Sequence, residues 1–244
     1  MNVVVTGGGT IAPIDDVRSI ANLSSGRFSA LITEACLNRG ASVWHVHAPS
    51  AQLPLLRSAR FDLDTPDPEV EAARLATLRR EWLAARDRLH LLPLGRGGVA
   101  EYAETLRRVV TERPIDVAFL AMAVSDYEPE PVAGKIDSDN RSITIRARRA
   151  PKVIRSVRDW APGVYLVGFK LLSRSAPGDL IRVAETACIA NRADLTVAND
   201  LQTLREGRHT VHLVRPGHPA ETFGPGETLA EDVVDRVFTL AGEH

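Results

Sequence analysis

Two short segments near the N-terminus carry residue types that suit the binding of a phosphate group. A glycine run at residues 7–9 follows an apolar stretch, and glycines allow tight turns and close approach of the backbone to a ligand. Ser24, Ser25 and Gly26 stand just before an expected helix, where unpaired backbone N–H groups and the helix dipole favour an anion. Together the two segments predict a phosphate-bearing ligand; a tight loop with a serine cap is the alternative.

A second group of polar residues follows the apolar segment 115–124. Asp126 comes directly after this segment, and Lys135 lies in the proline-rich loop beyond it. Ligands of open α/β sheets bind at the carboxyl ends of strands, so Asp126 is placed to contact a ribose hydroxyl or a metal. Lys135 could meet negative charge that develops during a reaction. The alternative for a loop lysine is simple solvation.

Metal and nucleophile chemistry have less support. His45 and His47 share one face of an expected strand, but two histidines without a third nearby ligand fall short of a zinc site. No metal site made by direct protein ligation is therefore predicted. Ser24 or Ser25 as an acyl nucleophile would need a positioned base, which spacing alone does not identify, so both serines are assigned to phosphate contacts.

The elements that must position these residues alternate between apolar strands and amphipathic helices. This order predicts an α/β, Rossmann-like three-layer fold with a mostly parallel central sheet and a small β extension. Strands are expected at 3–5, 42–47, 89–94, 115–124, 164–169 and 195–198, and 142–148 alternates as an edge strand would. Helices are expected at 27–38, 69–88, 99–112, 179–192 and 227–240 and after Pro151, with a hairpin-like segment before the last helix.

The expected helix 69–88 has a clear apolar face. Leu75, Leu78, Trp82 and Ala85 recur at alternating spacings of three and four residues, which places them on one side of the helix. That face could cover the sheet or a partner subunit.

Composition excludes several functional classes. The 30 basic and 31 acidic residues nearly balance, so no overall field favours nucleic acid or an anionic membrane as a partner. A length of 244 residues suits one large domain over 1–244. Cys36 and Cys188 fall in apolar helical patterns and are expected to be core thiols, which indicates a cytoplasmic protein. Neither a signal peptide nor a membrane-spanning run is expected.

An ordered series of motifs resembles the phosphopantothenoylcysteine synthetase family, also called phosphopantothenate–cysteine ligase. The series is TGGGT, PIDDVR followed by SIANLSSG, then AMAVSDY, GKI, PKVI, VGFK and VAND, and it spans nearly the whole chain. The resemblance implies that CTP or ATP, with Mg²⁺, activates the carboxylate of 4′-phosphopantothenate as an acyl-nucleotidylate and releases pyrophosphate. The amine of L-cysteine then attacks this intermediate, giving the amide and a nucleoside monophosphate. A homodimer is also implied.

The same resemblance assigns site residues. It implies catalytic roles for Asn22 and Lys135, and substrate contacts for Arg18, Asn22 and Ala123. The side-chain amide of Asn22 could hold the acyl carbonyl or the substrate phosphate without a change of charge. Nucleotide contacts are implied for Gly8, Gly9, Ser24, Ser25, Gly26, Leu120, Asp126, Lys135, Pro151, Lys152, Val153, Ile154 and Phe169.

The chain departs from the family pattern at several places. Ala187 and Asn191 stand where two helix lysines are usual. Lys170-Leu171 is more similar to the ATP-dependent eukaryotic type than to the CTP-dependent bacterial type, so the nucleotide stays open. The stretch 50–88 is a longer insertion than the bacterial pattern has. Other departures are Ile11-Ala12 in place of Arg-Glu, and Arg27-Phe28-Ser29 in place of Lys-Met-Gly.

Two other functions are weighed against a ligase. A noncatalytic nucleotide-binding or phosphopantothenate-binding protein on the same scaffold would fit the loss of the helix lysines. An NAD(P)-dependent oxidoreductase is less well supported, because Gly9 is followed by Thr10-Ile11-Ala12 rather than by the further glycine of the dinucleotide fingerprint. No tyrosine has a lysine four residues on, as the proton-donor pair of short-chain dehydrogenases would require.

Overall fold

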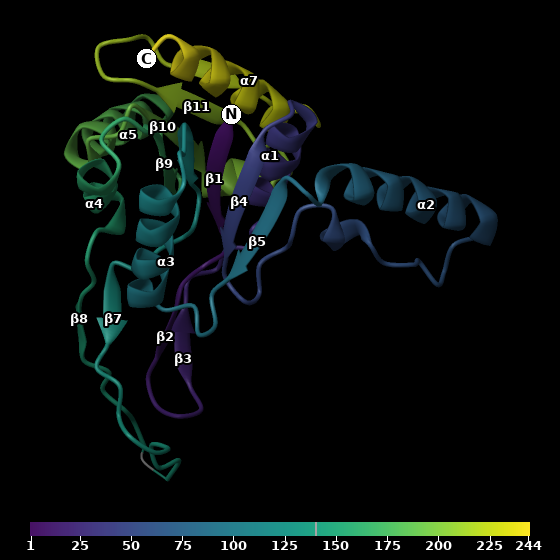
Figure 1. Ribbon diagram of the computed structural model, residues 1–244. Coiled ribbons are helices and arrows are strands. Elements are labelled where there is room, and N and C mark those ends of the chain that lie inside the picture. The colour runs from purple at the N-terminus through teal and green to yellow at the C-terminus, as the bar shows by residue number, and fades with distance from the viewer. Residues whose placement is uncertain (140) are drawn as a thin grey trace.

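A computed structural model describes residues 1–139 and 141–244 of the chain. The described residues form an eight-stranded sheet in the order β12-β11-β10-β9-β6-β1-β4-β5 (Figure 1). Its parallel strands are β1 (Asn2–Gly7), β4 (Ser42–His47), β5 (Leu89–Pro93), β6 (Val117–Leu120), β9 (Tyr165–Leu172) and β10 (Leu195–Asp200). At one edge, β11 (Val211–Val214) and β12 (Glu221–Phe223) continue the sheet in the antiparallel sense. The mostly parallel sheet is the predicted one.

Apolar residues on both faces of the strands explain why the sheet lies between two layers of helices. Val3 and Val5 pack in one core with α1 (Arg27–Asn38) and α7 (Leu229–Gly242). Val4 points to the other face, into a core with α3 (Val99–Glu112) and α4 (Val153–Trp160). On that second face Ala198 of β10 packs against α5 (Pro177–Asn191). Strands buried on both faces are typical of parallel sheets, and the three-layer prediction is confirmed.

Two small β ribbons extend from the carboxyl ends of the sheet. The first pairs β2 (Ile11–Pro13) with β3 (Ser19–Ala21), and the second pairs β7 (Tyr127–Pro129) with β8 (Ala147–Arg149). Figure 1 shows both hanging below the sheet. The prediction of an edge strand over 142–148 was wrong in two respects: residues 142–146 are not in a strand, and β8 pairs only with β7. These residues are exposed, so no core selects one face of the alternating pattern.

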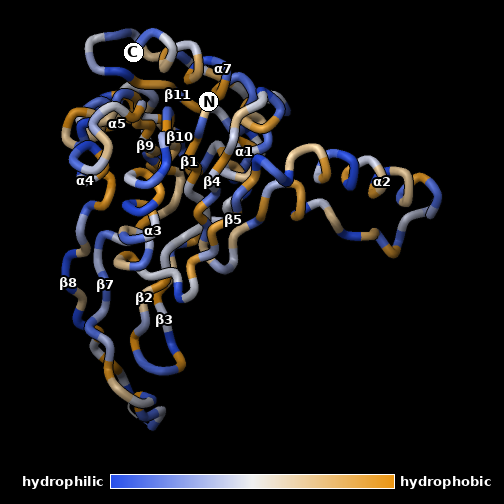
Figure 2. Tube along the Cα trace, viewed as in Figure 1, coloured by the Kyte–Doolittle hydropathy of each residue, from blue (hydrophilic) through white to orange (hydrophobic). Residues whose placement is uncertain are grey.

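The helix α2 (Pro68–Ala85) projects from the body as an arm, which Figure 1 shows clearly. Asp67 caps it by accepting hydrogen bonds from the N–H groups of Glu69 and Val70 at 3.0 and 3.2 Å. Its apolar face meets the body only at the C-terminal end of the helix, where Ala85 is buried in the core and Trp82 packs against it. The rest of that face does not cover the sheet, and covering by a partner subunit stays a prediction. Leu75, Leu78 and Trp82 are only partly buried, and Figure 2 shows hydrophilic and hydrophobic positions mixed along the arm. The short 3₁₀ helix η1 (Leu56–Ser58) precedes it.

The remaining expectations differ from the structure mainly at element ends. The predicted helices 27–38 and 99–112 coincide with α1 and α3, whereas the predicted strand 115–124 is a strand only over Val117–Leu120. The short helix α6 (Leu201–Arg205) follows β10. Cys36 and Cys188 are buried and free. Within the described part of the chain, no helix combines the length and the apolar character needed to cross a membrane.

Candidate active site

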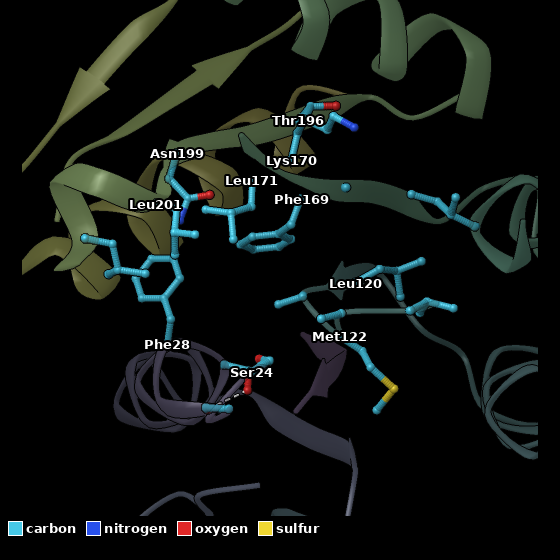
Figure 3. Close-up of a pocket in the computed structure, with 18 of the residues that line it drawn as sticks. Ser24, Phe28, Leu120, Met122, Phe169, Lys170, Leu171, Thr196, Asn199 and Leu201 are labelled. Atoms are coloured by element: carbon cyan, nitrogen blue, oxygen red, sulfur yellow. Dashed lines mark hydrogen bonds between the residues drawn. The ribbon is translucent and has the colours of Figure 1, made fainter. Parts of the chain in front are cut away.

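A large cavity of about 1360 Å³ lies at the carboxyl ends of β6, β9 and β10. The N-termini of α1 and α4, the last turns of α5 and the loops after α6 and β12 complete its walls. Figure 3 shows side chains from these elements around it. The predicted site residues that line it are Ser24, Ser25, Gly26, Leu120, Ala123, Asp126, Pro151, Lys152, Val153, Ile154 and Phe169. Segments that are distant in sequence thus share one cavity, where open α/β sheets bind ligands.

The wall at the start of α1 is suited to an anion. Gly26 is the N-cap of this helix, with φ at 72°, a left-handed value that glycine adopts without strain. It offers no side-chain oxygen to the first N–H groups of the helix, so an anion can take that place. The hydroxyl of Ser25 accepts a hydrogen bond from the N–H of Arg27 at 3.3 Å, which fixes the serine segment against the helix.

Asp126 and Lys152 meet across the cavity rim. The Nζ of Lys152 donates a hydrogen bond to Oδ1 of Asp126. The backbone N–H of Ala150 also donates to the carbonyl oxygen of Asp126, at 2.9 Å, so the loop after β6 is joined to the segment that leads into α4. Both charged side chains keep substantial exposure, 60% for Asp126 and 43% for Lys152. A ligand hydroxyl can therefore reach the carboxylate, and a phosphate can reach the ammonium group.

An aromatic wall faces the interior of the cavity. Phe28 lies edge-to-face against His209, with ring centroids 4.6 Å apart, and against Phe169 at 6.3 Å. Asn199 brings its amide nitrogen to 3.4 Å from Nε2 of His209. Burial lowers the pKa of His209, and the nearby Arg27 lowers it further, which favours the neutral ring. Nothing in the sequence around His209 marked it as a site residue, because its neighbours are distant in the chain.

Asn22 lies beside the cavity rather than in its lining. Its side-chain nitrogen donates a hydrogen bond to the carbonyl oxygen of Ala123 at 3.0 Å, which leaves the amide oxygen available. The backbone of Asn22 passes so close to Gly9 that a Cβ there would come within 2.0 Å of the Asn22 carbonyl oxygen. Gly9 therefore permits the close passage of these two segments. Gly8 accepts a hydrogen bond from the N–H of Ala123 at 2.9 Å and also lies outside the lining, so nucleotide contacts at both glycines stay predictions.

Arg18 and Lys135 lie away from the cavity of their own chain. The guanidinium of Arg18 donates to Asp15 at 2.6 Å and to the carbonyl oxygen of Ile136 at 3.1 Å. Asp15 in turn accepts a hydrogen bond from the N–H of Ile136 at 3.0 Å. The first ribbon is thereby tied to the loop that carries Lys135, whose side chain is exposed. The structure does not bring these two predicted residues to the others, and their roles stay predictions.

The described residues contain no group of three or more His, Cys, Asp or Glu side chains that could hold a metal ion. His45 and His47 are buried, and Nδ1 of His45 is 2.7 Å from the hydroxyl of Thr33. Among the residues that the structure describes, the carboxylates that line the cavity are those of Asp126 and Glu227. Mg²⁺ usually binds through one or two carboxylates together with substrate phosphates, so the site fits an ion that enters with a nucleotide.

Comparison with known proteins identifies the family. The model of the DNA/pantothenate metabolism flavoprotein C-terminal domain matches residues 1–67 and 98–240. Phosphopantothenate–cysteine ligase 2 of Oryza sativa subsp. japonica is 31% identical, over 99% of this chain and 80% of that protein. The bifunctional protein CoaBC of Thermococcus kodakarensis is 27% identical, and the match covers only 44% of it.

Solved structures agree on the fold. The DNA/pantothenate metabolism flavoprotein from Streptococcus pneumoniae matches with a TM-score of 0.76 and 25% identity over the whole of both chains. A Cab2 mutant solved in complex with phosphopantothenate-cysteine matches with a TM-score of 0.84 and 23% identity, over 99% of this chain and 86% of that one. Because the family model covers most of the chain, the protein belongs to the family of the DNA/pantothenate metabolism flavoprotein C-terminal domain.

Proposed function

We propose that this protein is a phosphopantothenate–cysteine ligase of coenzyme A biosynthesis. It joins 4′-phosphopantothenate to L-cysteine through an acyl-nucleotidylate made from CTP or ATP. The observation that carries the proposal is the single cavity at the ends of β6, β9 and β10, where serine, aspartate and lysine residues from distant segments meet. The named ligase relatives support the same activity.

The chemistry requires that a poor leaving group be replaced. A carboxylate oxygen leaves only after it has been joined to a nucleotidyl group, and this step releases pyrophosphate. Donors and cations fixed around the reacting centre stabilise the charge that gathers there. Asp126 is proposed to bind the ribose and Lys152 a phosphate, while the aromatic wall of Phe28, Phe169 and His209 offers a surface for the base.

Asn22 and Lys135 are proposed as the catalytic residues. The free amide oxygen of Asn22, beside Ala123, is suited to orienting the acyl intermediate or the attacking amine. Mg²⁺ that enters with the triphosphate would neutralise part of the phosphate charge. Lys135 lies on the loop that Asp15 holds against the first ribbon. In this position it does not line the cavity, so its proposed role requires that it reach an active site elsewhere.

In a homodimer, Lys135 and Arg18 of one copy could reach the cavity of the other copy. The turn between β2 and β3 and the loop after β7 expose apolar side chains near these residues: Val17 is 65% exposed and Val132 51%. A second copy of the chain seated on this surface would bury them. Light scattering should then give a mass of about twice 26.5 kDa, and Val17→Asp should give the monomer mass. A monomeric parent protein would contradict the dimer.

The remaining proposals concern organisation and location. Residues 1–244 are proposed to form one domain with an insertion at 50–88, and the family model leaves out 68–97, which includes the arm α2. Two free, buried thiols fit a reducing compartment such as the cytoplasm.

The decisive experiment measures pyrophosphate release by the purified protein. Mg²⁺ and 4′-phosphopantothenate are supplied with CTP or ATP, each with and without L-cysteine. Release that depends on 4′-phosphopantothenate would support the ligase and name its nucleotide. Nucleotide binding without any release would instead favour the noncatalytic binding protein, for which the neutral residues Ala187 and Asn191 of the cavity wall are the supporting observation.

A further inference from the structure

One side of α2 faces the segment that leads out from the body. The guanidinium of Arg74 donates a hydrogen bond to the carbonyl oxygen of Ser58 at 2.9 Å. Closer to the start of the helix, a carboxylate oxygen of Glu71 accepts the N–H of Asp62 at 3.0 Å. The outgoing segment therefore runs beside α2 in the opposite direction, and residues 63–67 form the outer end of the arm (Figure 1).

The opposite side of α2 faces solvent. A line of four exposed residues, spaced by four, three and four positions, runs along it: Glu69, Ala73, Ala76 and Arg80. In the part of the chain that the structure describes, neither Glu69 nor Arg80 forms an ion pair, and Arg80 donates to the hydroxyl of Thr77 in its own helix. The line thus has an unpaired negative charge near the outer end of the arm and an unpaired positive charge nearer the body.

The charges of the whole arm are divided in the same sense. Residues 61–71 include five acidic residues and no basic one, whereas residues 72–88 include five arginines and two acidic residues. The helix dipole acts on the first and last turns only, so it does not account for Arg79 and Arg80, which lie more than one turn before the end at Ala85. An arm with a negative outer part and a positive inner part is complementary to a second copy of itself turned end to end.

We propose that α2 pairs antiparallel with α2 of a second copy of this chain, about a two-fold axis that passes midway between Glu69 and Arg80. A two-fold interface uses the same surface twice, so Glu69 of one copy meets Arg80 of the other at both ends. Ala73 lies opposite Ala76 in this register, and no bulky side chain there holds the helices apart. A parallel pairing would instead place like charges together.

Apolar side chains exposed on the arm fit the same arrangement. Leu83 is 38% exposed and follows Arg80 towards the body, and Leu63 is 90% exposed in the outer turn. The antiparallel register brings Leu83 of each copy to the outer turn of the other, where burial of both side chains is favourable.

The arm contact goes beyond the proposed ligase function and its ribbon dimer. The arm leaves the body in a different direction from the two ribbons (Figure 1), so the two contacts use separate surfaces. The family model leaves out 68–97, which includes α2. The arm contact is therefore a feature of this chain that the family match does not supply.

Analytical ultracentrifugation tests the pairing in the Val17→Asp background, which removes the proposed ribbon contact. A contact between two helices is small and therefore weak, so the average mass should lie near 26.5 kDa in dilute solution. It should rise up to about twofold at high protein concentration as pairs form. Because exposed charges contribute to the contact, high salt should oppose this rise.

Charge reversal gives the sharpest comparison. Glu69→Arg and Arg80→Glu should each raise the Kd of association by about tenfold or more, because each variant places like charges against one another at both ends. An equimolar mixture of the two variants should associate like the background protein, since the reversed charges then match. Arg107→Glu makes the same charge change on the exposed side of α3 and, as the matched control, should not alter the Kd.

The mixture also controls for poor folding, because misfolded variants would not regain association. A Val17→Asp protein whose mass does not change with concentration would overturn the proposal, as would unchanged association of Glu69→Arg. Variants that lose association separately and do not recover it when mixed would overturn the antiparallel register. None of these outcomes depends on pyrophosphate release, so a failure of this proposal is distinct from a failure of the ligase proposal.

Discussion

Two parts of the molecule project beyond the central sheet, and each is fastened by the same device. In the first ribbon Asp15 pairs with Arg18, three residues on, at 2.6 Å. Near the start of α2, Glu71 pairs with Arg74, also three residues on and also at 2.6 Å. The further partners differ. Asp15 accepts the N–H of Ile136 from the loop that carries Lys135, whereas Glu71 accepts the N–H of Asp62 from the segment just before the arm.

The difference shows that the same kind of ion pair can hold together segments near a candidate active site, or merely fix a local segment of the chain. The ribbon clamp joins segments more than a hundred residues apart, which lie next to the predicted catalytic residues. The arm clamp joins neighbouring residues, and the family model does not extend over the arm. Function should therefore be sensitive to the first clamp and insensitive to the second.

The largest expected effect lies at the residue that follows the ribbon. Asn22→Ala should reduce kcat by about a hundredfold or more, because it removes a polar group held beside the reacting centre, while nucleotide binding is kept. Turnover assays and calorimetry on the same preparation would separate the two quantities. Unchanged turnover would remove Asn22 from the mechanism and the ribbon region from the active site.

The matched pair Asp15→Ala and Glu71→Ala tests the comparison itself. Asp15→Ala should lower kcat/KM by about tenfold or more, because the loop of Lys135 loses its anchor and spends less time in its productive position. Glu71→Ala should leave kcat/KM within about twofold, since Glu71 holds only segments next to the arm and none that line the cavity. Similar losses in both variants would show that the arm also serves catalysis.

Lys135→Ala gives a further contrast within the ribbon region. Removal of the side chain should slow the first half-reaction, seen as slower pyrophosphate release, by about tenfold. Asp15→Ala combined with Lys135→Ala should then be little worse than Lys135→Ala alone, because both changes act through one residue. Fully additive losses would mean that Asp15 acts independently of Lys135.

Limited proteolysis should show a smaller effect on the arm. Glu71→Ala frees Arg74, which otherwise donates to the carbonyl oxygens of Ser58 and Arg60 at 2.9 and 2.6 Å. Trypsin should then cleave at the arginines of α2 several times faster than in the parent protein, with the rest of the chain intact. An unchanged cleavage rate would indicate that other contacts hold the arm.

The smallest effect is expected from acid. Burial raises the pKa of Asp15, but hydrogen bonds from the N–H groups of Ile136, Val17 and Arg18 and from the Arg18 guanidinium outweigh it and bring the pKa to about 2. The side-chain hydrogen bond from Arg74, helped by the N–H of Asp62, brings the pKa of Glu71 to about 2. The ordinary pKa values of these two side chains are 3.8 and 4.5.

Both carboxylates therefore stabilise the folded state at neutral pH, and this stabilisation is lost as the pH falls from their ordinary pKa values towards 2. Carboxyl NMR titration should find both midpoints near 2. A midpoint near 4 for only one of the two would show that the corresponding clamp is open in solution.

Local patterns were enough to predict the helices and the buried strands. Residues 27–38 and 99–112 have helical periodicity and lie as predicted, because their apolar faces meet the sheet. The first ribbon was not predicted, since its strands span only three residues each and owe their pairing to the Asp15 network. Alternation over 142–148 was misleading, because these residues are exposed and no core selects one face of the pattern.

The candidate site likewise contains residues that the sequence identified and residues that it did not. Motif order placed Ser24, Asp126, Lys152 and Phe169 at segment ends, and the structure gathers them around one cavity. His209 could not be assigned from its neighbours in the chain, because what makes it notable is its contact with Phe28 in the cavity wall. Lys135 was singled out by its motif, yet its own chain holds it away from the cavity.

By itself, the sequence determined the alternation of strands and helices, the glycine turn after the first strand and the positions of polar residues at strand ends. These follow from side-chain periodicity and backbone freedom, which act over a few residues. Only the tertiary structure decided which walls face one another: the start of α1 opposite Lys170, and Phe28 against His209. Such pairings depend on strand order and on the crossing of distant segments, and a linear pattern carries no information on either.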